Sequence, residues 1–257
     1  MRNTLTFFSK EFRMQFFSPV AYVVMVGFLL LAGFFFYSFF SQYSQILSYA
    51  GQFQDPTVYQ QINLNDLVFT PTMENIFIML LLLVPILTMR LISEEKKQGT
   101  DELLLTSPVD IVEFVLGKYL AALAFYALLL VLTFQFPMIL ARFGSIDFGK
   151  VASSYLGLLL LGAAFIALGL FASSVTKSQI VAAMASFSAL LAFLMLGFMS
   201  EQFSGFAKHA FEYVALTKHF EKFLDGVINT GDILYFITFA FFFVFLSVRS
   251  VESTRWR

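Results

Sequence analysis

Long apolar runs separated by short polar segments dominate this chain of 257 residues. A helix needs about 20 apolar residues to cross the hydrocarbon core of a bilayer. Six runs suit such spans, at residues 20–40, 73–91, 112–141, 151–175, 180–199 and 233–248. Pro85 and Pro137 lie inside the second and third runs, so local kinks are expected there. The pattern predicts an all-α membrane protein in which residues 1–257 form one transmembrane domain.

Composition agrees with this fold class. Hydrophobic residues make up 59% of the chain and charged residues only 13%, a balance that does not suit a soluble globular domain. The chain has no cysteine, which excludes disulfides and thiolate metal sites. Its net charge of −1 offers no basic surface for nucleic acid, so membrane lipid is the expected surrounding partner.

The distribution of Lys and Arg predicts how the chain crosses the membrane. With the N-terminus placed in the cytoplasm, most of the 16 Lys and Arg residues fall on the cytoplasmic side of the six spans. Those that fall outside are Arg142, Lys150, Lys208, Lys218 and Lys222. Because cytoplasmic loops carry the excess of positive charge, both termini are expected in the cytoplasm.

Residues 1–18 are expected to form a helix that lies in the cytoplasmic membrane interface. The apolar side of this helix consists of Leu5, Phe8, Phe12 and Phe16. Lys10 and Arg13 lie opposite, as in amphipathic helices that bind the surface of a membrane. A plain cytoplasmic extension of the first span is the alternative.

Three expected helices share a start signal, a hydroxyl residue followed by proline. The pairs are Ser18-Pro19, Thr70-Pro71 and Ser107-Pro108. A Ser or Thr side chain can cap free amides, and proline at the first helical position loses no hydrogen bond. We therefore expect the first three spans to start at these pairs, with Asp110 at the third helical position of the third span.

Small residues concentrate in the fourth and fifth spans. The fourth carries Gly157, Gly162, Ala163, Ala167, Gly169 and Ser173. Such residues let helices approach closely in a membrane, so these positions are expected to form helix contacts. A tight turn at residues 175–178 then folds the two spans into an antiparallel pair.

The most heavily charged stretch, residues 93–108, lies between the second and third spans. Gly99 can take the left-handed conformation that ends a helix, and Thr100 can cap a second helix. Asp101 and Glu102 would then lie at the positive end of the dipole of that second helix. Its body carries Leu103, Leu104 and Leu105.

Three consecutive leucines do not suit a solvated loop and should be buried. They could dip into the lipid interface or pack under the bundle. They could instead fill a hydrophobic groove on a soluble partner, with acidic residues at the rim of that groove. These acidic residues are Glu94, Glu95, Asp101 and Glu102.

This segment resembles the one that follows the second span in ABC-2 type ABC transporter permeases. The shared pattern is E-x-x-x-G-T-x-E from Glu95 to Glu102, then leucines, Pro108, and Leu116-Gly117-Lys118 near the start of the third span. In that family the region forms a short cytoplasmic coupling helix that inserts into the ATP-binding subunit. The resemblance implies this role for Glu94, Glu95, Gly99, Thr100, Asp101, Glu102, Leu103, Leu104, Leu105 and Pro108.

The layout of six spans and an interfacial N-terminal helix matches the family over essentially the whole chain. Residues Phe7 to Arg13 and Ser18 to Tyr22 further resemble the gliding-motility-associated permeases of the family. The resemblance implies two copies of an ABC ATP-binding subunit and a second permease chain, identical or homologous. It also implies a bacterial inner membrane location and leaves room for an extracytoplasmic auxiliary subunit.

The chain carries no nucleotide-binding loop of its own. Residues 144–150 fit the G-x-x-x-x-G-K pattern, but Val151 stands where a phosphate loop needs Ser or Thr to bind Mg²⁺. No cofactor is therefore expected in this chain, and ATP with Mg²⁺ is assigned to the partner ATPase. The middle third of each span also lacks ionisable residues, which argues against an ion-coupled transporter and an intramembrane enzyme.

Residues 200–231 are expected to form two short extracytoplasmic helices, because apolar residues recur there at helical spacing. His209 and His219 lie in this segment, but with the nearby Glu residues they lack a convincing third metal ligand. The other outer segment, residues 41–72, is polar and suits either a solvated connector or a loop that binds a partner.

Together these observations predict the permease subunit of an ATP-driven exporter. It would form half of a dimeric translocation unit and catalyse no reaction itself. The alternative is a membrane scaffold or receptor that recruits a soluble partner without transporting anything. An ATPase assay on the copurified partner distinguishes the two hypotheses, because a scaffold would not need its partner to hydrolyse ATP.

Overall fold

The computed structural model describes residues 2–53, 63–99, 110–200 and 202–254. All regular structure in these residues is helical. The elements are α1 (Arg2–Phe17), α2 (Pro19–Phe53), the π-helical turn η1 (Asn65–Phe69), α4 (Thr70–Thr88), α5 (Ser93–Gln98), α7 (Ile111–Thr133), α8 (Gln135–Leu140), α9 (Phe148–Val175), α10 (Gln179–Ser200), α11 (Phe206–Val214), α12 (Leu216–Leu224) and α13 (Thr230–Thr254). Six spans of the described chain are long and apolar enough to cross a membrane, which confirms the predicted fold class.

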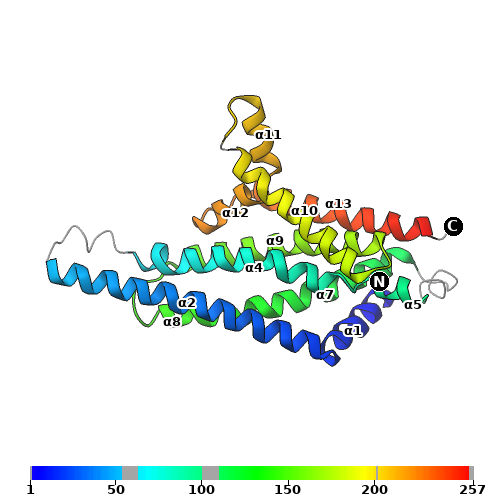
Figure 1. Cartoon of the computed structure of the whole chain (residues 1–257), viewed down its shortest axis with the longest axis horizontal. Coiled ribbons are helices and arrows are strands. Elements are labelled where there is room, and N and C mark those ends of the chain that lie inside the picture. The colour runs from blue at the N-terminus through cyan, green and yellow to red at the C-terminus, as the bar shows by residue number, and fades with distance from the viewer. Residues whose placement is uncertain (1, 54–62, 100–109, 201, 255–257) are drawn as a thin grey trace.

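The helices form an elongated bundle (Figure 1). Helices α2, α4, α7, α9 and α13 run along its length, whereas the later part of α10 leads away from the bundle to α11. Helices α1 and α5 lie at the same end as both chain termini. We call this the terminal end. The start of α4 and the short helix α8 lie toward the opposite end.

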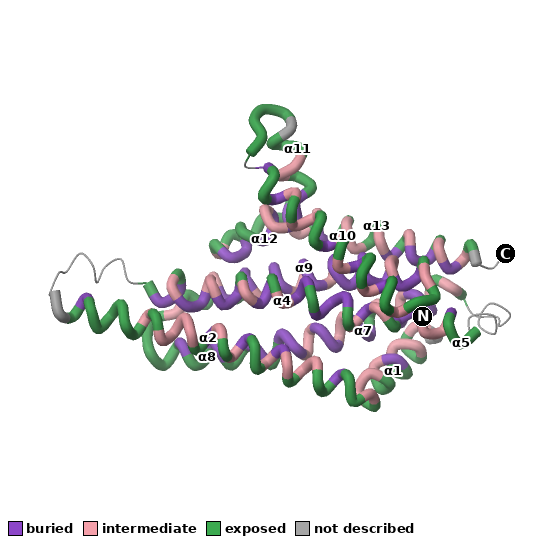
Figure 2. Tube along the Cα trace, in the orientation of Figure 1, coloured by how far each residue is buried: buried purple, intermediate pink, exposed green. Residues whose placement is uncertain are grey.

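Helix α9 is the centre of the bundle (Figure 2). In its most apolar window 67% of the residues are buried, against 17% in α2 and 22% in α10. Its neighbours are α4, α7, α10, α12 and α13. The core therefore forms around α9, and α2 and α10 lie at the periphery.

Glycines in α9 let neighbouring helices approach its backbone. A methyl group on Gly162 would lie 2.1 Å from the ring of Tyr126 in α7. One on Gly169 would lie 2.2 Å from Thr88 Oγ1 in α4. The Tyr126 hydroxyl also donates a 2.6 Å hydrogen bond to the carbonyl of Leu158. The expected role of these glycines in helix contacts is confirmed.

Helix starts differ from the prediction at two of the three proline pairs. Helix α2 begins at Pro19 as expected, but Thr70 caps nothing, because η1 leads into α4 without a break. The Thr70 amide donates to the carbonyl of Asn65 instead. Pro71 cannot donate a backbone hydrogen bond and crowds the carbonyl four residues earlier, and the wider π-helical turn accommodates this.

The third span begins with a different cap from the one expected. Asp110 has an extended backbone and its Oδ1 accepts a 3.0 Å hydrogen bond from the amide of Val112. It is therefore the N-cap of α7 and not a residue of its first turn, which corrects the prediction. The pair Ser107-Pro108 lies outside the described residues.

Several connections are more helical than the hydropathy pattern indicated. Helix α2 has 35 residues, or about 52 Å at 1.5 Å per residue, and extends well beyond residues 20–40. Helix α13 similarly extends the sixth predicted span at both ends. The expected kink near Pro137 appears as a break at Phe134 between α7 and α8. Helices α11 and α12 confirm the two short helices expected within residues 200–231.

Helix α1 packs on α7 and does more than present an apolar side to the membrane. Phe7, outside the predicted apolar side, contacts α7 at Gly117, where an added methyl group would lie 2.6 Å from Phe7 Cβ. The Phe7 and Phe114 rings meet edge to face at 5.6 Å. Leu5, by contrast, is 68% exposed. The face of α1 that α7 covers is therefore rotated from the predicted one.

Substitution Gly162→Ala is expected to lower the free energy of unfolding by about 1–3 kcal/mol, because the new methyl group overlaps the Tyr126 ring. Thermal unfolding in detergent measures the effect. The matched control is Gly33→Ala in α2, where nothing lies within 4 Å of the added carbon. Equal melting temperatures for the two variants would show that the Tyr126 ring does not pack against the backbone of α9 at Gly162.

Candidate functional site

One buried ammonium joins three segments at the terminal end. Lys118 lies in the second turn of α7, and its side chain is 3% exposed. Its Nζ lies 2.7 Å from Glu11 Oε1 of α1 and 3.0 Å from Glu95 Oε1 of α5. The ammonium also lies 5.1 Å from the centroid of the Phe114 ring. Residues far apart in the sequence therefore share a single positive charge.

The chemistry of this site favours keeping the three segments together. A buried ammonium without partners costs several kcal/mol, and a nearby carboxylate offsets that cost. Here two carboxylates, 12% and 19% exposed, surround it. Moving either α1 or α5 away removes one carboxylate from Lys118. The contact therefore resists independent motion of these helices.

Hydrogen bonds to α9 fix the turn between α4 and α5. The amides of Ile92 and Ser93 donate to Ser173 Oγ at 3.1 and 3.0 Å. The Ser173 hydroxyl donates in turn to the carbonyl of Met89 at 3.2 Å. One hydroxyl thus accepts from two amides that the start of α5 leaves free and donates to a carbonyl at the end of α4, which also accepts from Ser93 Oγ.

The last turn of α9 holds two further segments. The ammonium of Lys96 in α5 donates a hydrogen bond to the carbonyl of Ser174. Ser250 of α13 donates to the same oxygen at 3.1 Å. A carbonyl at a helix C-terminus is an acceptor that the helix itself leaves free. The end of α9 therefore anchors both α5 and α13.

The described part of the predicted coupling segment is α5, which contacts the start of α7 and the end of α9. Gly99 ends α5 in the left-handed conformation, with φ 69° and ψ 13°, as the sequence predicted. Glu94 is half-buried and accepts a 3.4 Å hydrogen bond from Gln98 Nε2. Glu95 was expected at the rim of a partner groove, but its carboxylate faces Lys118 instead. This pairing was not predicted, and the contact of Glu95 with a partner stays a prediction.

The remaining predicted contacts lie outside the described residues. They are Thr100, Asp101, Glu102, Leu103, Leu104, Leu105 and Pro108. Asp110, which follows them, caps α7. The described chain therefore stops at Gly99, the C-cap of α5, and resumes at Asp110, the N-cap of α7.

Sequence reasoning did not assign Lys118, Glu11, Ser173 and Ser174 to the site. A signal was present for Lys118, because a charged residue close inside an apolar span needs a partner. Nothing in the local sequence identifies that partner as Glu11, which is 107 residues away. The two serines carry no distinguishing pattern, because serine is common in helices that cross membranes.

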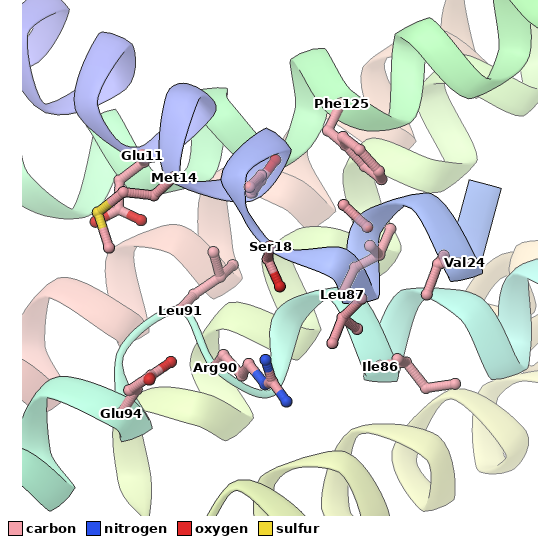
Figure 3. Close-up of a pocket in the computed structure, with 13 residues that line it drawn as sticks. Glu11, Met14, Ser18, Val24, Ile86, Leu87, Arg90, Leu91, Glu94 and Phe125 are labelled. Atoms are coloured by element: carbon pink, nitrogen blue, oxygen red, sulfur yellow. The ribbon is translucent and has the colours of Figure 1, made fainter.

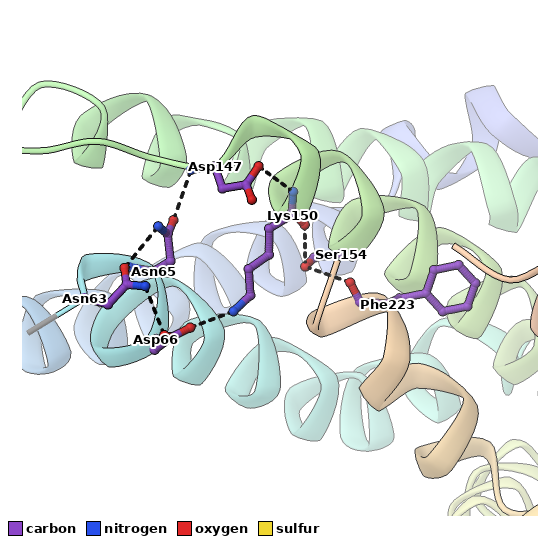
Figure 4. Close-up of polar contacts among 7 residues, drawn as sticks. All are labelled: Asn63, Asn65, Asp66, Asp147, Lys150, Ser154 and Phe223. Atoms are coloured by element: carbon purple, nitrogen blue, oxygen red, sulfur yellow. Dashed lines mark hydrogen bonds and ion pairs between the residues drawn. The ribbon is translucent and has the colours of Figure 1, made fainter. Parts of the chain in front are cut away.

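At the opposite end, polar contacts join η1 to the start of α9 (Figure 4). Lys150 Nζ lies 2.7 Å from Asp66 Oδ1. Asp147 caps α9 by accepting from the amides of Gly149 and Lys150, and its own amide donates to Asn65 Oδ1 at 3.3 Å. These contacts engage the lysine of the stretch that resembles a phosphate loop. That lysine has a structural role.

A second polar cluster joins α11 and α12 to the start of α13. His219 Nδ1 lies 2.5 Å from Asp232 Oδ1, and its Nε2 lies 3.1 Å from the carbonyl of Tyr213. Lys222 Nζ donates to the same Asp232 carboxylate at 3.0 Å. The His219 ring stacks on Tyr235 at 4.0 Å between centroids. Both ring nitrogens are engaged within the protein, so this histidine serves to hold the helices together.

Comparison with known protein families identifies the chain. A family model described as ABC-2 family transporter protein matches residues 5–251. The chain belongs to this family. A search of curated proteins finds no match for this ABC-2 family member. Family and fold together make it a multi-pass membrane protein and a membrane component of a transport system.

Substitution Lys118→Met in this ABC-2 family protein is expected to lower the free energy of unfolding by about 3 kcal/mol, because two partly buried carboxylates lose their shared cation. Adding Glu95→Gln and Glu11→Gln should recover part of that loss. Thermal unfolding in detergent reports both effects.

Lys97→Met is the matched control, because Lys97 is an exposed lysine of the neighbouring helix α5. It is expected to change the free energy of unfolding by less than about 0.5 kcal/mol. A loss as large as that of Lys118→Met would mean that the buried lysine contributes no more to the free energy of unfolding than an exposed one.

Proposed function

We propose that the chain is the permease subunit of an ATP-driven exporter, coupled through residues 93–108 to a separate ATP-binding subunit. The observation that carries this proposal is the Lys118 contact, which links the start of residues 93–108 to α1 and α7. A membrane subunit driven from outside the bilayer needs such a rigid connection. Membership in the ABC-2 family supports the general role.

The contacts define a route for mechanical coupling. A push on the segment after Gly99 acts directly on α5. Lys118 passes that push to α1 and α7, and Ser173 and Ser174 pass it to α9. The spans that these contacts join, α4, α7, α9 and α13, would then tilt together, as in the rigid-body transitions of other switching proteins.

The energy source is assigned to another polypeptide. Val151 replaces the hydroxyl that a phosphate loop needs, and Lys150 is engaged by Asp66. ATP and Mg²⁺ would bind the partner, in two copies for a dimeric unit. The terminal end would face the cytoplasm, as the distribution of Lys and Arg predicts. The membrane would be the bacterial inner membrane.

A second permease chain, identical or homologous, would complete the pathway. The centre of this chain is filled by buried apolar side chains of α9, among them Phe165, Ile166 and Leu168. A pathway between two chains avoids opening that core. Helices α2 and α10, of which little is buried, leave surface for a second chain and for lipid.

The finer resemblance to gliding-motility-associated permeases extends this proposal. It rests on residues Phe7 to Arg13 and Ser18 to Tyr22. An extracytoplasmic auxiliary subunit would then meet the end of the bundle opposite the termini. Copurification of such a subunit with the chain tests this extension.

Substitution Leu104→Asp is expected to abolish the stimulation of ATPase activity by the permease, because a charge replaces an apolar side chain proposed to enter the ATP-binding subunit. The ATPase is measured on the complex copurified from coexpression with its ATP-binding subunit. Membrane insertion should be unchanged. Loss of the copurified ATPase would equally support the docking contact.

The control is Leu47→Asp, an exposed leucine in the C-terminal part of α2, whose first residue, Pro19, follows the elbow at the terminal end. It should leave the ATPase stimulation intact. Normal stimulation in Leu104→Asp would exclude the proposed coupling contact. Binding of a partner that hydrolyses no ATP would favour the scaffold alternative.

A further inference from the structure

A pocket opens at the terminal end where α1, α2, α4 and α7 meet (Figure 3). Its volume is about 240 Å³. It lies beside the elbow at Ser18, where the chain turns from α1 into α2. The pocket borders the start of the coupling segment, because Glu94 of α5 is among its lining residues, and all of the lining residues belong to the described part of the chain.

One side of the pocket is apolar. Val24 of α2, Ile86 and Leu87 of α4, and Phe125 of α7 line this side. Ile86 is 43% exposed on the outer surface of its helix. Because α2 and α4 are long enough to cross a membrane, this wall continues onto surface that faces hydrocarbon. It therefore suits acyl chains.

The other side of the pocket is polar and carries both signs of charge. Arg90 is exposed and makes no ion pair with the described residues. The carboxylates of Glu11 and Glu94 lie on the same pocket wall. Gln15 adds a buried Oε1 atom without a hydrogen-bond partner. A ligand that satisfies this set needs an anionic group for Arg90 and a hydrogen-bond donor for the oxygen atoms.

We propose that the pocket binds a phospholipid whose headgroup carries a phosphate and a primary ammonium, as phosphatidylethanolamine does. Arg90 binds the phosphate, and the ammonium donates to Glu94 and to Gln15 Oε1. The acyl chains lie along the apolar wall toward Ile86. This site requires only that the chain spans a membrane, so it stands independently of the proposed export function.

Charge decides between the common headgroups. A phosphoglycerol headgroup is negative and would face two carboxylates after binding Arg90. A phosphocholine headgroup has the same net charge as phosphoethanolamine, but its trimethylated nitrogen has no hydrogen to donate to Gln15. Phosphoethanolamine alone of these three offers both an anion and an N–H donor.

The location gives the lipid a structural effect. It would bridge α1, through Gln15, and the end of α4, through Arg90. These two elements enclose the elbow that sets the direction of α1 against the bundle. A bound lipid therefore holds α1 at its angle to the spans.

The test measures lipid binding to the purified full-length chain in detergent, by native mass spectrometry and by thermal unfolding. Phosphatidylethanolamine, phosphatidylcholine and phosphatidylglycerol with identical acyl chains are added separately. The wild-type chain should retain phosphatidylethanolamine best and be stabilised most by it. Arg90→Gln should weaken this binding about ten-fold, as expected for loss of a charged hydrogen bond.

Glu94→Gln should reduce the preference for phosphatidylethanolamine over phosphatidylglycerol, because it removes one of the two carboxylates that face the headgroup, while binding through Arg90 is kept. The matched control is Arg13→Gln, an exposed arginine of α1 that lies outside this pocket. It should change binding by less than about two-fold. The headgroup preference of the wild-type chain tests the site even where a variant fails to fold.

Three outcomes would overturn the proposal. The first is equal binding of all three lipids by the wild-type chain. The second is an equal loss in Arg13→Gln and Arg90→Gln, which would mean general attraction of lipid to surface charge. The third is stabilisation by none of the lipids.

Discussion

Burial of the Lys118 ammonium between two carboxylates determines how the terminal end is built. A charge in apolar surroundings is tolerated only while its partners stay close. Glu11 and Glu95 reach it from α1 and α5, so the elements before the first span and after the second are tied to the start of the third. Ser173 then ties the turn before α5 to the central helix. The connection between outer segments and spans is thus a consequence of charge burial.

The two ends of the bundle use ion pairs in different ways. At the terminal end the cation is 3% exposed, and both its partners are mostly buried. At the opposite end Asp66 remains 59% exposed in its pair with Lys150. Water screens such a pair, so it contributes little to stability. Of these two ion-pair sites, the buried one therefore lies where the proposed coupling segment joins the spans.

The sequence predicted what depends on local composition. Apolar runs located the spans, and Gly99 ended α5 as its lack of a side chain allows. The pair Thr70-Pro71 did not mark the start of a helix, because the residues before it already form the helical turn η1. A capping rule considers only the residues that follow the cap, so it cannot detect such a turn. The direction of Glu95 was also missed. It depends on Lys118 and Glu11 meeting in space, which no local pattern encodes, and residues 100–109 stay a prediction.

The glycines of α9 also decide which helices can shift separately. Tyr126 and Thr88 sit in notches on the backbone of α9, at Gly162 and Gly169. Sliding α7 or α4 lengthwise would press these side chains against the next turn, so the three helices can only swing as one unit. Two of the three glycines of α2, Gly27 and Gly33, have no neighbour within 4 Å of an added carbon. No interlock of this kind therefore holds α2 at these two positions.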